Sequence, residues 1–232
     1  MGERTFDDFD EYAKDYRSIH TANIRLSGAD SFYFAEQKVL TLKKYEVDNE
    51  VKMLDIGCGD GVVEIFIQQH FPRWQVEGID VSNKSLEQAR ARDIRNASFG
   101  LYDSKKIPFG DNSFDLIFLA AVLHHIDFTL HAAFIKEIHR VLRKGGRIYI
   151  FEHNPLNPAT RYLVKTCIFD KDARLLSYMY TKKILKAVAF SDLKKSFILF
   201  FPRKGFLSFF VKFEGILGWL PLGAQYYFRA VK

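Results

Sequence analysis

The stretch Leu54-Asp55-Ile56-Gly57-Cys58-Gly59-Asp60-Gly61 decides the fold of this chain. An apolar run, Val51–Ile56, leads directly into a glycine-rich turn, and the segment VVEIFIQQHF after the turn has helical spacing. Glycines let a backbone approach a ligand without an intervening Cβ, and free N–H groups at a helix start favour an anionic group. The stretch therefore predicts a buried strand, a ligand-binding turn and a helix.

Short apolar runs and longer helical patterns alternate beyond this point, which is typical of a parallel sheet with helices on both faces. A helix is expected from Ser82, another over Ala132–Leu142, and a turn at Lys144-Gly145-Gly146. The strands expected after the first are Trp74–Asp80, Ala97–Leu101, Phe114–Ala120 and Arg147–Phe151.

Two late aromatic strands, Ser196–Phe201 and Gln225–Val231, complete the pattern. Right-handed crossovers place them side by side at one sheet edge, with the last strand antiparallel. The predicted fold class is α/β: a Rossmann-like, doubly wound, seven-stranded, mostly parallel sheet in a single domain over 1–232. Residues 1–45 form a helical cap segment, and residues 202–223 form an aromatic, helical insertion between the last two strands.

The glycine turn alone does not identify the ligand. The nicotinamide fingerprint needs a third glycine where this chain has Val62, which disfavours a dinucleotide. Asp80 ends the second strand, where a carboxylate can accept both hydrogen bonds of a ribose diol. A nucleoside cofactor of another kind is the better expectation.

Five segments in order resemble the successive motifs of class I S-adenosylmethionine-dependent methyltransferases over about residues 50–153. They are LDIGCGDG, GIDVS, the Asp103 region, FDLIFLAAVLHHI and RVLRKGGRIYIFEH. The resemblance implies S-adenosylmethionine as cofactor, with S-adenosylhomocysteine as product. The cofactor-binding residues that it implies are Asp55, Gly57, Cys58, Gly59, Asp80, Val81, Tyr102, Asp103 and Ala120.

The resemblance also implies roles for these residues. Gly57 and Gly59 lie against the methionine part, whose ammonium Asp55 and the carbonyl near Ala120 help to orient. Asp80 holds the ribose hydroxyls, Val81 packs on the adenine, and Asp103, with Tyr102 beside it, accepts from the adenine amino group. Two alternatives stay open: Asp60 is a helix cap or a ligand, and Asp103 a ligand or a turn-stabilising residue.

A narrower resemblance extends into the C-terminal half. Phe151-Glu152-His153-Asn154-Pro155, Asn157-Pro158, Phe169-Asp170 and the segment from Trp219 to Tyr227 are similar to a bacterial subgroup associated with polysaccharide or surface-glycan biosynthesis. This implies a small-molecule or glycan acceptor.

Histidines follow the fourth and fifth strands, at the edge where ligands bind in doubly wound sheets. A hydroxyl acceptor benefits from a base whose pKa is near the working pH, so His125 or His153 is the expected general base. The alternative for His125 is a role in shaping the cofactor pocket. The cap carries Tyr12, Tyr16, His20, Tyr33, Phe34 and Lys38, which either line the acceptor pocket or pack on the sheet.

Composition narrows the class of protein further. The 232 residues carry a net charge of +6, but the basic residues are scattered, so a nucleic-acid partner is not expected. Neither a signal peptide nor a membrane-spanning run is found, which favours a cytoplasmic protein. Cys58 and Cys167 lie far apart and fit no disulfide framework or zinc pattern, so no metal site is predicted.

The aromatic insertion begins with Arg203 and Lys204 and continues with Phe206, Phe209, Phe210 and Phe213 at helical spacing. Such a surface needs a cover, and the candidates are the roof of the active site, a homodimer contact, or peripheral membrane contact through 203–222.

The expected function is methyl transfer to a small-molecule or sugar acceptor, by O-methylation. The alternatives are a tRNA or protein methyltransferase and a non-catalytic S-adenosylmethionine-binding protein.

Overall fold

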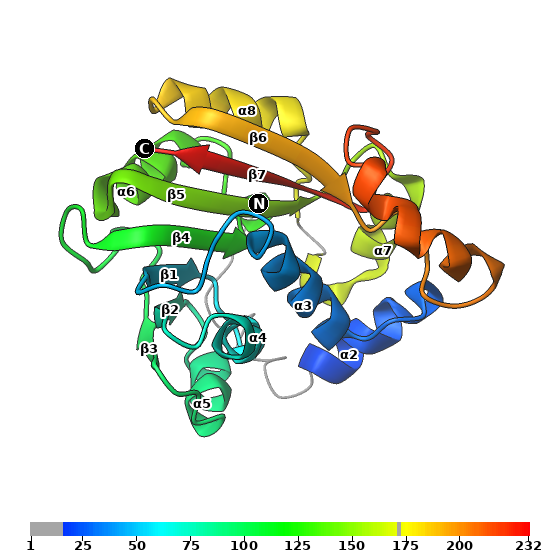
Figure 1. Ribbon diagram of the computed structural model, residues 1–232, viewed down its shortest axis with the longest axis horizontal. Helices are drawn as coiled ribbons and strands as arrows, with labels where there is room; N and C mark the ends of the chain where they lie inside the picture. Colours follow the sequence, from blue (N-terminus) through cyan, green and yellow to red (C-terminus); the bar gives the residue numbers. More distant parts are fainter. Residues whose placement is uncertain (1–15, 171–172) are drawn as a thin grey trace.

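The computed structural model describes residues 16–170 and 173–232, so Tyr12 lies outside the described residues, as do the side chains of Tyr16 and His20. Seven strands form one sheet in the order β3-β2-β1-β4-β5-β7-β6, which confirms the predicted fold class (Figure 1). The strands are β1 (Lys52–Ile56), β2 (Gln75–Asp80), β3 (Ala97–Leu101), β4 (Phe114–Ala120), β5 (Leu142–His153), β6 (Ser191–Ile198) and β7 (Gln225–Val231).

Strands β1 to β5 pair in parallel, and β7 pairs antiparallel with both β5 and β6. The last strand of the chain therefore lies between two earlier ones. Because β7 runs antiparallel to both of its neighbours, β5 and β6 run in the same direction, and their carboxyl ends lie at the same edge of the sheet as those of β1 and β4.

Helices cover both faces of the sheet, and each face has its own apolar core. On one side α3 (Ser31–Leu42) and α4 (Val62–His70) pack Leu42 and Ile67 against Phe118. On the other side α6 (His131–Val141) and α8 (Tyr178–Ala187) pack Ile135 and Leu185 against the sheet. The remaining helical segments are α2 (Tyr16–Asn23), η1 (Arg25–Ser27), α5 (Asn83–Ala91), η2 (Leu123–His125), α7 (Pro158–Thr166), η3 (Ile168–Asp170) and η4 (Phe206–Ile216).

The largest differences from the predicted boundaries are in β6 and β5. The strand expected over Ser196–Phe201 is β6, which begins at Ser191 and ends at Ile198. Lys194 and Lys195 interrupt its apolar pattern, and such charged side chains are usual on an edge strand. The turn expected at Lys144–Gly146 lies within β5. There Gly145 takes a positive φ, and the backbone of Gly145 and Gly146 pairs with Lys232 at the end of β7.

The cap and the insertion meet at the carboxyl edge of the sheet (Figure 1, blue and orange to red). The backbone N–H of Arg203 donates to Ser27 O at 2.7 Å, and the Asn23 amide donates to Leu163 O of α7 at 3.1 Å. No helix in the described part of the chain is long and apolar enough to cross a membrane.

Candidate active site

A cavity of about 1440 Å³ opens at this edge of the sheet, between the glycine turn, the cap and the ends of β4 and β5. Single-ligand pockets in proteins commonly have volumes of about 300–1,000 Å³, so this cavity has room for a cofactor and an acceptor together. Most of the predicted cofactor residues line it: Asp55, Gly57, Cys58, Gly59, Asp80, Val81, Tyr102 and Ala120.

Asp103 lies elsewhere. It is exposed, and its carboxylate accepts from the backbone N–H of Lys105 at 3.0 Å, as the turn alternative expects. Its neighbours Tyr102, Ser104 and Lys105 line the cavity, whereas Asp103 itself is not among the lining residues.

The glycine turn has a backbone conformation that favours glycine at three positions. Gly57, Gly59 and Gly61 all have positive φ, and a Cβ at Gly57 would lie 2.6 Å from Val122 Cγ2. A Cβ at Gly59 would meet nothing within 4 Å, so the backbone there borders open cavity. Asp80 supports the turn, because its carboxylate accepts from Gly59 N at 2.8 Å and from Ser82 N at 2.9 Å.

Asp60 fixes the cap to this turn. Its buried carboxylate forms ion pairs with Arg17 of α2 and with Arg92, whose Nη2 lies 2.6 Å from Asp60 Oδ2. The helix-cap alternative for Asp60 is wrong, since α4 has Gly61 at its N-cap and no side-chain cap bond. Asp60 also lines the cavity.

Buried charged groups surround Asp55 at the floor of the cavity. Burial and the neighbouring Glu64 carboxyl raise the pKa of Asp55 well above its usual value, and burial also raises the pKa of Glu64 to about 7. Burial lowers the pKa of Lys38, on the cap helix α3, to about 8. Asp55 Oδ2 is buried and makes no hydrogen bond to the described residues. A ligand cation at this position would satisfy an acceptor that the protein leaves open.

The turn after β4 brings two adjacent histidines to the opposite wall of the cavity. Glu152, buried at the end of β5, accepts from Leu123 N at 2.8 Å and lies 2.6 Å from His124 Nδ1. His131 of α6 contacts Leu123 O through Nε2 at 3.0 Å. The turn is therefore anchored by β5 and α6.

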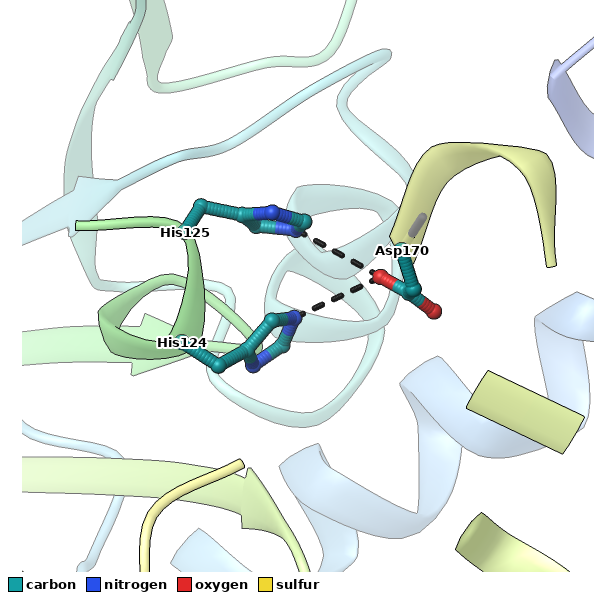
Figure 2. A group of neighbouring side chains, drawn as sticks. All are labelled: His124, His125 and Asp170. Atoms are coloured by element: carbon teal, nitrogen blue, oxygen red, sulfur yellow. Dashed lines mark ion pairs between the residues drawn. The ribbon is translucent and has the colours of Figure 1, made fainter. Parts of the chain in front are cut away.

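Asp170 faces both histidines (Figure 2). Its Oδ1 lies 3.5 Å from His124 Nε2 and 3.6 Å from His125 Nε2. Burial opposes a charge on His124, but the Glu152 and Asp170 carboxylates outweigh it and raise the pKa of His124 to about 9. The same histidines hold the pKa of Asp170 far below its usual value despite its burial.

The two predicted bases differ in their surroundings. His125 and His153 both line the cavity. The side chain of His125 is 18% exposed, beside the Asp170 carboxylate. Burial, together with the positive charge of His124, lowers the pKa of His153 to about 4.

One atom each of His124, His125 and Asp170 lies within 4.8 Å of the others, close enough to hold a metal ion. The sequence predicted no metal site because Asp170 is far from the histidines in the chain. Glu152 and Asp170 were not predicted to act in the site. A signal for Asp170 was the Phe169-Asp170 pair, which belongs to the narrower resemblance.

Comparisons with known proteins agree with this geometry. Residues 54–150 match a family described as a methyltransferase domain. The strand order and the glycine turn agree with this match, so residues 54–150 are similar to methyltransferase domains in both sequence and fold.

Two curated relatives resemble parts of the chain. A ubiquinone/menaquinone biosynthesis C-methyltransferase of Desulfotalea psychrophila is 30% identical over 105 residues, covering 45% of this chain and 42% of the relative. The 27-O-demethylrifamycin SV methyltransferase of Amycolatopsis mediterranei is 34% identical over 102 residues, covering 42% and 36%. The chain thus spans less than half the length of either relative.

Among solved structures, the Haemonchus contortus phosphoethanolamine N-methyltransferase 2 in complex with S-adenosyl-L-methionine superimposes with a TM-score of 0.71 at 21% identity. The match covers 100% of this chain and 60% of that one. This likeness is one of fold.

Proposed function

We propose that this chain transfers the methyl group of S-adenosylmethionine to a hydroxyl group of a small-molecule or sugar acceptor. The observation that carries the proposal is the single cavity that joins the glycine turn, Asp55 and Asp80 to His125. S-adenosylmethionine supplies an electrophilic methyl group, and the protein supplies alignment, exclusion of water and a base.

The residues present fit this cofactor. Asp55 would accept from the methionine ammonium, whose positive charge would oppose the burial and the nearby Glu64 carboxyl that raise the pKa of Asp55. Gly59 would let the backbone approach the methionine part, and Asp80 would hold the ribose hydroxyls. Val81 and Tyr102 would border the adenine, and the Ala120 carbonyl would also face the ammonium.

His125 is the general base in this proposal, and Asp170 positions it. His125 would take the proton that the acceptor hydroxyl loses on methylation, and the Asp170 carboxylate, 3.6 Å from His125 Nε2, would stabilise the resulting imidazolium cation. The pKa of about 4 makes His153 a poor base near neutral pH, so we assign it to the wall of the pocket. His124 is already engaged by Glu152 and holds the turn in place.

The acceptor atom follows from this chemistry. Deprotonation of a hydroxyl produces an oxygen nucleophile, so O-methylation is the direct outcome. In a phenolic acceptor, the negative charge of the deprotonated oxygen is delocalised onto ring carbons. This relates the proposal to the quinone C-methyltransferase among the relatives. A role in surface-glycan biosynthesis is supported by the sequence resemblance in the C-terminal half.

The first test is calorimetric titration with S-adenosylmethionine and S-adenosylhomocysteine. Asp80→Asn removes the charge and one carboxylate acceptor, and we expect at least about tenfold weaker binding, the worth of one lost charged hydrogen bond. Glu77→Gln on the same strand is the matched control, because Glu77 does not line the cavity. Absence of binding by folded wild-type protein would refute the proposal.

The second test concerns turnover. Methyl transfer to sugar, lipid-linked glycan and phenolic acceptors is measured for the wild type and for His125→Gln and Asp170→Asn. We expect both variants to bind the cofactor normally and to lose about 100-fold or more in kcat, the usual contribution of a general base. Cofactor binding without turnover on any acceptor would favour a non-catalytic binding protein, and turnover on tRNA or protein would favour that alternative.

A further inference from the structure

The aromatic insertion, residues 202–223, presents a large apolar face to solvent. Phe206 is 83% exposed, Trp219 73% and Ile216 72%. η4 has no buried residue, and the cavity lining includes Pro202 and Arg203 but none of 204–223. Only the start of the insertion can therefore form part of the roof of the active site. The exposed apolar residues of this face are Phe206, Leu207, Phe209, Phe213, Ile216, Trp219 and Leu222.

The exposed charged side chains of the insertion are all positively charged. Arg203, Lys204 and Lys212 are exposed. The ammonium of Lys212 lies 3.9 Å from the centre of the Phe209 ring and 5.2 Å from that of Phe213, so a cation sits within the apolar face. The one carboxylate of the insertion, Glu214, accepts from the backbone N–H groups of Phe200 and Phe201 at 2.9 Å each.

Aromatic rings connect this face with the cavity. Phe201 lines the cavity, and its ring centre is 5.6 Å from that of Phe210. The Phe210 ring contacts those of Phe206 and Phe209 at 5.8 Å and 5.6 Å. An apolar chain lying along this row would reach from the exposed face to the wall of the cavity.

We infer that the exposed face of the insertion binds the surface of an anionic lipid bilayer. Phe and Trp side chains with Lys and Arg beside them are the composition of interfacial segments, in which rings enter the acyl boundary and cations meet the headgroups. Resting on the proposed function, the inference also names the acceptor class: a molecule with a polar, hydroxyl-bearing head on a long apolar chain, which enters the cavity from the bilayer.

The charge pattern favours a bilayer over a second copy of the chain. In a symmetric dimer the same patch meets itself, which would place the Lys212 ammonium group of each copy within the apolar contact. The insertion holds no outward carboxylate to neutralise them, because Glu214 is bound to the backbone. An anionic headgroup layer supplies the missing negative charge.

The experiment is co-sedimentation of the protein with phosphatidylcholine vesicles, with and without phosphatidylglycerol, at low salt and without cofactor. We expect binding that requires phosphatidylglycerol. Phe206→Ser/Phe209→Ser/Trp219→Ser should weaken it by more than about 100-fold, because three rings that enter the acyl boundary are lost together. Lys212→Glu alone should weaken it by about 30-fold, because the attraction of one cation to the anionic surface is lost and a similar repulsion replaces it.

Val47→Ser/Met179→Ser is the matched control, since these side chains are 69% and 64% exposed outside the insertion, and it should bind as the wild type does. Unchanged S-adenosylhomocysteine affinity shows that a variant is folded. Absence of vesicle binding by the wild type, or equal binding by the triple variant, overturns the inference. So does a wild-type dimer in light scattering that the triple variant dissociates.

Failure of the inference and failure of the proposed function are distinguishable, because vesicle binding needs neither cofactor nor acceptor. If the protein binds S-adenosylhomocysteine but does not bind vesicles, the inferred bilayer contact is wrong and the proposed function is unaffected. The acceptor class is tested by comparing an amphiphilic phenol embedded in vesicles with its water-soluble headgroup. Faster methylation of the embedded acceptor, lost in the triple variant, is the expected result, and equal rates contradict it.

Discussion

The two glycines of the cofactor turn provide a matched pair for testing the geometry. Both have positive φ, +80° at Gly57 and +56° at Gly59, so alanine at either position costs about 1–2 kcal/mol of backbone strain. Only at Gly57 does the new Cβ meet a neighbour, Val122 Cγ2 at 2.6 Å, and forced overpacking adds about 1–3 kcal/mol. We expect Gly57→Ala to cost about 2–5 kcal/mol in the free energy of unfolding.

Urea unfolding of Gly57→Ala, Gly59→Ala, Val122→Ala and the double variant Gly57→Ala/Val122→Ala measures this directly. In the cycle, Val122→Ala should remove the steric part of the Gly57→Ala cost and leave the strain. Equal costs for the two glycine variants, or no coupling to Val122, would refute the reasoning. Gly59→Ala should instead weaken S-adenosylhomocysteine binding, since its Cβ enters the space where the backbone approaches the cofactor.

Two further predictions concern the histidine turn. The folded protein raises the pKa of His124 to about 9, so protonated His124 stabilises the fold by on the order of 3 kcal/mol. This stabilisation is fully present below about pH 6.5 and is lost as the pH rises through about 9. The difference in unfolding free energy between the wild type and His124→Asn should therefore shrink over that range, whereas the difference for His139→Asn should not; a constant difference for His124 would contradict the assignment. A proton on His124 also places positive charge beside Asp170, so methyl transfer should survive dialysis against a chelator. A loss of turnover that added zinc or magnesium restores would show that the His124, His125 and Asp170 cluster holds a metal ion.

The sequence predicted the parts of the fold that are coded locally. Buried parallel strands such as Phe114–Ala120 are continuous apolar runs, and the glycine turn requires residues with positive φ, so both leave a direct trace. Helices α7 and α8 were not predicted. The edge strand β6 was placed too late in the chain, because solvent-facing lysines interrupt its apolar pattern.

The site was predictable where one motif supplies it and not where distant segments meet. Gly57, Asp80 and His125 follow strands that end at the same edge, so topology alone brings them together. Asp170 reaches the histidines through η3, and Arg17 reaches Asp60 from the cap. No spacing rule relates those positions, since the contacts depend on tertiary packing of segments far apart in the chain.

The position of β7 has a consequence for the order in which the chain assembles. β6 is joined to the rest of the sheet through β7, which is hydrogen-bonded on both sides and follows it in sequence. During synthesis, β6 and the aromatic insertion have no place on the sheet until residues 225–231 have emerged, and long-range pairing of this kind forms slowly. Until then the apolar face of the insertion and the edge of β5 are exposed together, which makes this stage the one most prone to aggregation.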